Sequence, residues 1–196
     1  MINLLVEVVQ LFVLFFVIIE PFVSFSIFVA ATERMKPKER HQTANLAIFV
    51  AALLSLLVLL FGESLLTLFH TTLDDLRVAG GIVIGLLGIK MALGQSVTDI
   101  SKIKNSGSKA IAAIIGTPLL TGPATITAII VATQDFGTAV TGVAIFLVLA
   151  FTSLIFYFSD FFKKIMGQTT LQIISTVLGL VTLSWAVQFI RTGLGF

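Results

Sequence analysis

Long apolar runs recur along this chain and constrain its fold more than any other feature. They are about 20 residues long, enough to cross the roughly 30 Å hydrocarbon core of a bilayer as helices. Backbone polar groups in lipid must be satisfied within the segment, and the alternating pattern of a membrane barrel is absent. The composition agrees, since 57% of the 196 residues are hydrophobic, 11% are charged and mean hydropathy is +1.10. The chain is therefore predicted to be an all-α integral membrane protein.

Polar stretches divide the apolar runs into six predicted transmembrane helices. Charged loops are expected at residues 33–41, at residues 94–109 and around Asp160. An extension of the second span to Phe69 is left open. The predicted spans cover residues 4–30, 44–61, 76–93, 110–132, 138–158 and 171–192.

Lysine and arginine are unevenly divided between the two sets of loops. With six spans, the loops after the first, third and fifth spans share one side and hold nine basic residues, against two on the other side. Short cytoplasmic loops are enriched in these residues, so both termini are predicted to lie outside a plasma or inner membrane. The first run has no basic region before it and is interpreted as a retained span rather than a cleaved signal peptide.

Proline interrupts the first and fourth predicted spans at comparable places. Residues 18–24 read I-I-E-P-F-V-S and residues 115–121 read I-G-T-P-L-L-T, which aligns Pro21 with Pro118. Three spans in each half force the two halves to insert with opposite topology, the arrangement of inverted-repeat transporters. We therefore predict one transmembrane domain, 1–196, built from repeats at 1–94 and 110–196 with broken helices one and four.

Helix-breaking and small polar residues gather at these two breaks, near mid-membrane. A proline has no N–H and leaves the carbonyl four residues earlier unpaired, here those of Val17, Ile114 and Leu119. Such breaks persist in lipid where they are buried or line a polar cavity, and a restarting helix presents free N–H groups to an anion. A packed proline kink is the structural alternative. The predicted substrate-binding residues are Pro21, Ser24, Thr117, Pro118, Thr121, Gly122, Pro123, Ala124 and Thr125.

Glu20 is the only acidic residue deep within a predicted span. A charged and unpaired carboxylate is costly at that depth, and a residue of this kind suits proton coupling. Glu20 is therefore the candidate for ion coupling. Two other interpretations are open: a protonated glutamate that caps a free carbonyl, and a glutamate that faces a cytoplasmic vestibule.

Several other functions lack the residues they require. The absence of cysteine excludes disulfides, thiolate nucleophiles and iron–sulfur sites. His41 and His70 are far apart in sequence, which argues against a histidine metal site. Glu20 with Ser24 is too sparse a pair for an intramembrane enzyme. We expect no enzymatic activity, no cofactor, no metal and no nucleic-acid partner.

Four short motifs carry a family resemblance. They are L-R-V-A-G-G-I at 76–82, G-I-K-M at 88–91, T-G-P-A-T-I at 121–126 and V-Q-F-I-R-T-G at 187–193. With the six spans, they resemble the MarC/SnatA family of membrane proteins, which includes neutral amino acid transporters. The resemblance implies transport of glycine and alanine, driven by a cation gradient. This chain differs from the usual family pattern in having Glu20 where asparagine is common, and Thr121 and Ala124 in a motif that is commonly A-G-P-G.

The sequence thus predicts a secondary transporter that works by alternating access between two inverted halves. The substrate carboxylate is expected on the N–H groups of Ala124 and Thr125. Its ammonium is expected on free carbonyls near Val17 or Ile114, or on Glu20. The predicted partners are a small neutral amino acid, a proton or sodium ion and the lipid bilayer, with a homo-oligomer left open. The alternative functions are a channel or exporter for another small solute, or a membrane protein without transport.

Overall fold

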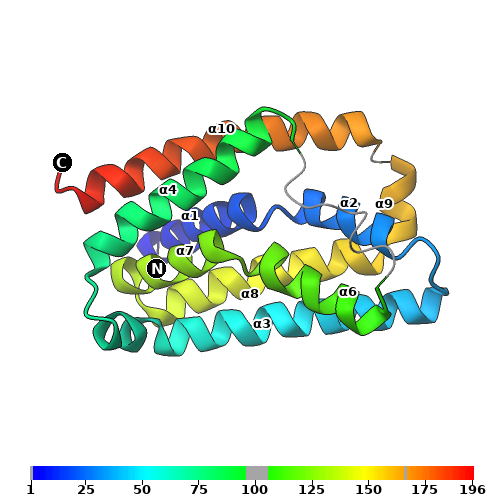
Figure 1. The fold of residues 1–196 in the computed structure, drawn as a ribbon, viewed down its shortest axis with the longest axis horizontal. Helices are drawn as coiled ribbons and strands as arrows, with labels where there is room; N and C mark the ends of the chain where they lie inside the picture. The colour runs from blue at the N-terminus through cyan, green and yellow to red at the C-terminus, as the bar shows by residue number, and fades with distance from the viewer. Residues whose placement is uncertain (1, 96–105, 166) are drawn as a thin grey trace.

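The computed structural model describes residues 2–95, 106–165 and 167–196, and helices joined by short turns make up this part of the chain (Figure 1). Most of the helices run along the long axis of the molecule. Their bounds are α1 Ile2–Ile19, α2 Pro21–Ala31, α3 Pro37–Leu68, α4 Leu73–Ala92, α6 Ser108–Ile114, the π-helical segment η1 Ile115–Leu120, α7 Pro123–Phe136, α8 Thr138–Tyr157, α9 Ser159–Ile165 and α10 Gln168–Gly193.

Four segments of the described chain are long and apolar enough to cross a membrane, namely Leu4–Ala31, Pro37–Leu68, Thr138–Tyr157 and Thr169–Gly193. A fifth results if α6–η1 and α7, which are bent by 52° at their junction, form one broken span. Helix α4 has 20 residues but contains Asp74, Asp75, Arg77 and Lys90, so it does not meet the same criterion. The protein is a multi-pass membrane protein, whereas the sixth span and the inverted repeat remain predictions.

All three predicted loops are partly helical, and α6 begins at Ser108 within the predicted 94–109 loop. Pro37 occupies the first helical position of α3 behind an extended Lys36, so α3 begins within the predicted 33–41 loop and includes His41. That histidine stacks on Tyr157 with the ring centroids 4.8 Å apart. The predicted loop around Asp160 forms the short helix α9. Charged residues at a membrane surface are compatible with such a helix when its polar side faces water. Of the predicted 94–109 loop, residues 96–105 lie outside the described part of the chain.

Helices α1 and α2 lie at the centre of the molecule, with α4 and α10 on one side and α3 and α8 on the other (Figure 1). The first span is the most buried of the apolar segments, and Phe15 and Phe28 are fully enclosed. Phe28 stacks on Phe156 of α8 with the ring centroids 4.5 Å apart. The outer faces of α3 and α10 carry many exposed leucine, isoleucine and valine side chains, as expected for surfaces in contact with lipid.

Helices α4 and α10 pack along glycines over their length. A Cβ atom on Gly179 would lie 2.6 Å from the Ala92 nitrogen and 3.0 Å from the Gly88 carbonyl oxygen. A Cβ atom on Gly81 would lie 2.9 Å from the Ala186 carbonyl oxygen. Such close approach of two backbones requires the absence of side chains, as in other membrane helix pairs.

Candidate functional site

The first span is broken at Glu20, as predicted. Glu20 has φ 49° and ψ 65°, a left-handed conformation that separates α1 from α2, and Pro21 takes the first position of α2. The backbone stays connected across the break, because the Glu20 N–H donates to the Phe16 carbonyl at 3.1 Å and the Ser24 N–H donates to the Glu20 carbonyl at 2.9 Å. The break therefore turns the chain without unwinding more than one residue.

The fourth predicted span is broken twice. Thr117 is extended, with φ −146° and ψ 120°, and its bond to Pro118 is cis. Gly122 is also extended, and α7 starts at Pro123. The counterpart of the Pro21 restart is thus Pro123, which likewise opens a regular helix, whereas the aligned Pro118 lies within η1. This second interruption is wider than the first because three residues, Thr117, Thr121 and Gly122, leave helical geometry.

A side-chain hydroxyl satisfies one freed carbonyl at each break. The Ser24 hydroxyl donates to the Ile19 carbonyl at 3.1 Å. The Thr125 hydroxyl donates to the Leu120 carbonyl at 3.1 Å. Both bonds reach back five residues and both hydroxyls are buried, so they replace backbone hydrogen bonds that the prolines and the turns remove.

Helix α7 opens with backbone donors that no turn of its own helix uses. Its first helical bond runs from the Ile126 N–H to the Gly122 carbonyl at 2.9 Å. The N–H groups of Ala124 and Thr125 precede that bond and are unpaired within the helix. Together with the helix dipole, they give this end of α7 a partial positive charge.

The two breaks face one cavity of about 220 Å³. Six of the nine predicted binding residues line it, together with Glu20: Ser24, Pro118, Gly122, Pro123, Ala124 and Thr125. The remaining lining is apolar and consists of Ile18, Ile19, Val23, Val83, Leu87 and Leu119. Val83 and Leu87 come from α4, and sequence reasoning missed them because an apolar residue in a span carries no mark of a cavity.

Three predicted residues do not line the cavity. The Thr121 hydroxyl is buried and donates to the Ala51 carbonyl of α3 at 3.2 Å, so it holds the second break against a neighbouring helix. Thr117 is exposed and Pro21 is buried, and neither residue lines the cavity. The proximity of these residues in sequence does not bring them to one surface, because the chain turns at each interruption.

Among the described residues, Glu20 contributes the only acidic group of the cavity lining. The residue is 5% exposed, and its Oε1 accepts a hydrogen bond from the Ser175 hydroxyl of α10 at 3.2 Å. Among the described residues, Glu20 forms no ion pair. A carboxyl group thus lies on one wall of the cavity and the N-terminus of α7 on another, an arrangement complementary to a ligand that carries both charges.

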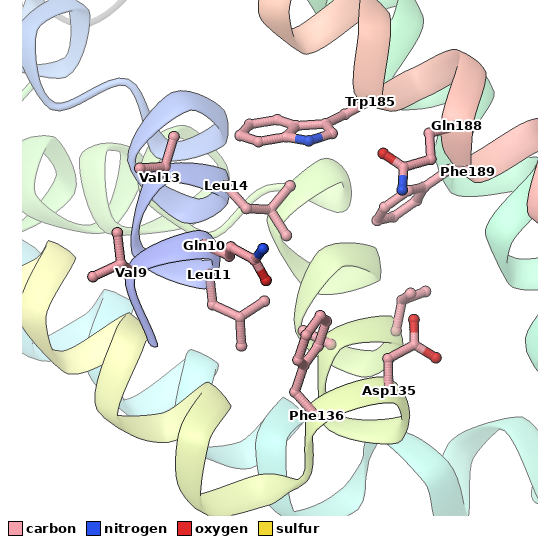
Figure 2. Close-up of a pocket in the computed structure, with 12 residues that line it drawn as sticks. Val9, Gln10, Leu11, Val13, Leu14, Asp135, Phe136, Trp185, Gln188 and Phe189 are labelled. Atoms are coloured by element: carbon pink, nitrogen blue, oxygen red, sulfur yellow. The ribbon is translucent and has the colours of Figure 1, made fainter. Parts of the chain in front are cut away.

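A second cavity, of about 500 Å³, opens between α1, α7 and α10 (Figure 2). Its polar residues are Gln10, Asp135, Trp185 and Gln188, and the rest of its lining is apolar. Sequence reasoning did not predict it, because these residues are dispersed over three helices. Among the described residues, no three His, Asp or Glu side chains lie close enough to share a metal ion.

Residues 5–195 match the family described as MarC family integral membrane protein. The chain belongs to this family. The predicted resemblance is confirmed, and the match covers the helical breaks as well as the α4–α10 pair.

Relatives in the MarC family cover nearly the whole chain. A UPF0056 membrane protein of Methanocaldococcus jannaschii is 32% identical over 187 residues, covering 91% of each chain. The UPF0056 membrane protein YvbG of Bacillus subtilis is 29% identical over 200 residues, covering 95% of this chain and 93% of the relative. A third, from Pyrococcus horikoshii, is 34% identical over 154 residues, which are 78% and 74% of the two chains. No solved structure matches the chain.

Proposed function

We propose that this protein is a secondary transporter of small neutral amino acids, such as glycine and alanine, coupled to a cation gradient. The observation that carries the proposal is the meeting of an acidic side chain and a helix N-terminus in one cavity of about 220 Å³. A zwitterionic substrate needs an acidic side chain for its ammonium group and a helix N-terminus for its carboxylate, in a space closed to bulk water. Breaks in two helices at a central site are the usual architecture of a transporter site.

The substrate carboxylate would lie on the N–H groups of Ala124 and Thr125, at the positive end of α7. The Ser24 and Thr125 hydroxyls already donate to carbonyls, so their oxygens are left to accept from an ammonium. Glu20 has a second carboxyl oxygen that bonds to no described residue and that would meet the same ammonium. Thr121 is not proposed to contact the substrate, because its hydroxyl donates to a carbonyl of α3.

The apolar part of the lining would set the size of the substrate. Val23, Val83 and Leu87 contribute branched side chains to a cavity that is already small. A hydrogen atom or a methyl group fits such a wall, whereas longer or polar side chains would clash or lose hydration. This is the reason for proposing glycine and alanine.

Coupling would pass through Glu20. A proton and the substrate ammonium compete for one carboxylate, so coupling at this residue alone gives exchange of the two. A cation that binds together with the substrate, such as sodium, gives symport instead. In either case we propose that the protein crosses the plasma or inner membrane with six spans in two inverted halves. The uneven distribution of basic residues predicts that both termini lie outside.

Two buried threonines provide a matched test. Thr125→Val and Thr121→Val each remove one hydroxyl bonded to a carbonyl, but only Thr125 lines the cavity. Glycine and alanine uptake would be measured in proteoliposomes, normalised to folded protein. We expect Thr125→Val to raise KM about fivefold, as for the loss of one hydrogen bond, and Thr121→Val to leave KM unchanged.

Two results would reject the proposal at different levels. Absence of saturable, gradient-dependent uptake by the unmodified protein across a panel of neutral amino acids would reject the transport function. Saturable uptake with equal KM changes in both threonine variants would agree with the transport function but reject the central cavity as the substrate site.

A further inference from the structure

The larger cavity lies at the end of the molecule where α1 begins and α7 and α10 finish (Figures 1 and 2). Its lining extends inward along α1 from Val9 to Leu14 and along α7 from Phe136 to Val131. Both termini lie at this end, which is the outer end in the predicted orientation. The cavity therefore faces the compartment from which a substrate outside the cell would arrive.

Three polar groups of this cavity have no hydrogen-bond partner within the described part of the chain. Figure 2 shows the Gln10 and Gln188 side chains projecting into the space between α1, α7 and α10, with the Trp185 indole beside them. None of their side-chain nitrogen or oxygen atoms forms a bond to a described residue. Gln10 and Gln188 are exposed, so their amides are open to water or to a ligand in the cavity. Their convergence on one cavity therefore indicates a wet or occupied site.

The charge and aromatic content of the lining favour an ammonium group. Asp135 is the only charged residue that the described part of the chain contributes to the lining, and one of its oxygens accepts a hydrogen bond from Arg77. Arg77 is shared with Asp74 at 3.0 Å, so two carboxylates meet one guanidinium at the rim. The rings of Trp185 and Phe189 add faces of the kind that attract ammonium groups.

The outer cavity is aligned with the central one along two shared helices. Leu14 in the outer lining and Ile18 in the central lining are one turn apart on α1, about 6 Å along the axis. Thr125 and Val131 are about 9 Å apart along α7. Ala128 lies between these two and is fully buried, so the cavities are separate but successive.

We propose that the outer cavity is a second binding site for the zwitterionic amino acid, from which substrate passes to the central cavity. The Gln10 and Gln188 amides bind the carboxylate, and Asp135 with the Trp185 ring binds the ammonium. The proposal rests on the proposed function for its ligand class. It differs in assigning two binding sites to each chain, at different depths.

Trp185 is the only tryptophan of the chain and lines this cavity, so its fluorescence reports on the site without a label. The full-length protein in nanodiscs would be titrated with glycine and with alanine. We expect a saturable change in emission, and a roughly tenfold weaker Kd in Gln188→Leu, which loses hydrogen bonds to a charged group. Gln172→Leu is the matched control, because Gln172 is exposed on the same helix and outside the cavity.

Binding stoichiometry provides the second measurement. Equilibrium dialysis with labelled glycine should approach two molecules per chain. At a glycine concentration below the weakened Kd of Gln188→Leu, the number should fall toward one in that variant, and it should fall to one in the central-cavity variant Gly122→Leu. One molecule per unmodified chain, or equal Kd values for Gln188→Leu and Gln172→Leu, would overturn the second site. If the protein binds one molecule per chain and still shows uptake, the proposed function stands and the second site is rejected. If it binds two molecules per chain but shows no uptake, the second site stands and the transport function is rejected.

Discussion

At the central cavity the first and fourth spans are interrupted, whereas α4, which forms another wall of this cavity, runs unbroken along α10 with glycines between them. In the first region Glu20 and Gly122 leave helical geometry and side-chain hydroxyls satisfy the carbonyls that result. In the second region Gly88 and Gly179 stay helical and bring two backbones together. Gly122 and Gly179 are thus the same residue type with different uses, one beside a cavity and the other in a closed interface.

This contrast leads to an expectation about mutational effects. Side chains at the interruptions have few neighbours on the cavity side, so changes there alter the ligand site more than the packing. Side chains introduced between α4 and α10 meet backbone atoms that have nowhere to move. Substitutions of the cavity-lining side chains Glu20 and Thr125 should reduce transport at nearly constant stability, and substitutions of glycines between α4 and α10 should reduce stability.

Glu20→Gln should have the largest effect. Glutamine keeps the length of the side chain and its hydrogen bond with Ser175, but removes the only carboxylate of the cavity lining. Loss of a charged hydrogen bond to the ammonium lowers kcat/KM by roughly 10- to 100-fold, and the response of uptake to an imposed pH gradient should vanish. Uptake at a series of pH values, beside the melting temperature, measures both. A pH profile parallel to that of the unmodified protein would exclude Glu20 from coupling.

Gly122→Ala should have the second-largest effect on uptake. A Cβ atom at this position would lie 2.5 Å from the Pro118 carbonyl oxygen, so the second break must open or shift at the entrance to α7. We expect glycine uptake to fall about tenfold, consistent with 1–3 kcal/mol of local overpacking. Gly107→Ala is the control, since a Cβ atom there meets nothing within 4 Å. Equal uptake by the two variants would show that the geometry at Gly122 is not needed for binding.

Gly179→Ala tests the second region, the interface between α4 and α10, through its effect on stability. The added methyl group would lie 2.6 Å from the Ala92 nitrogen, and we expect a loss of about 1–3 kcal/mol in the free energy of unfolding. In Gly85→Ala the nearest atom is the Ala186 Cβ at 3.4 Å, and the gain in helix propensity of about 1 kcal/mol should dominate. Thermal unfolding in detergent compares the two. If both variants melt alike, glycine packing does not stabilise this pair.

The smallest effect is expected at the exposed start of α4. The Thr72 hydroxyl accepts from the Asp75 N–H at 3.1 Å, and the Asp75 carboxylate accepts from the Thr72 N–H at 3.0 Å. The hydrogen bonds from Thr72 lower the pKa of Asp75 below its ordinary value. A lowered pKa stabilises the folded protein above the ordinary carboxyl pKa, and this contribution is lost as the pH falls through the lowered value.

Thr72→Ala should therefore reduce the melting temperature slightly near neutral pH, and the difference from the unmodified protein should shrink as the solution becomes acidic. Melting curves over a pH series provide the measurement. A difference that grows on acidification would contradict the assigned role of this capping box.

The breaks could be predicted from sequence because their causes are local. Proline removes an N–H wherever it stands, so the interruptions at Pro21, Pro118 and Pro123 follow from the residue itself. The surfaces that these breaks form depend on how helices cross. Thr121 and Thr125 are one turn apart and equally polar, yet one contacts α3 and the other lines the cavity.

Contacts between distant segments were less accessible from sequence. The partner of Glu20 is Ser175, which lies 155 residues away and has the same appearance as any other serine in a span. The outer cavity likewise requires Gln10 and Gln188 from opposite ends of the chain. Periodicity and composition describe one segment at a time, so they carry no information about such pairs.

The left-handed backbone at Glu20 has a consequence for how the sequence can change over time. A residue with a side chain costs roughly 1–2 kcal/mol in this conformation, and glycine does not. Glu20→Gly would also remove a buried acidic group that forms no ion pair with a described residue, so it should raise the melting temperature. Selection of random variants for heat resistance alone should therefore favour glycine at position 20, and selection for growth on an imported amino acid should restore glutamate.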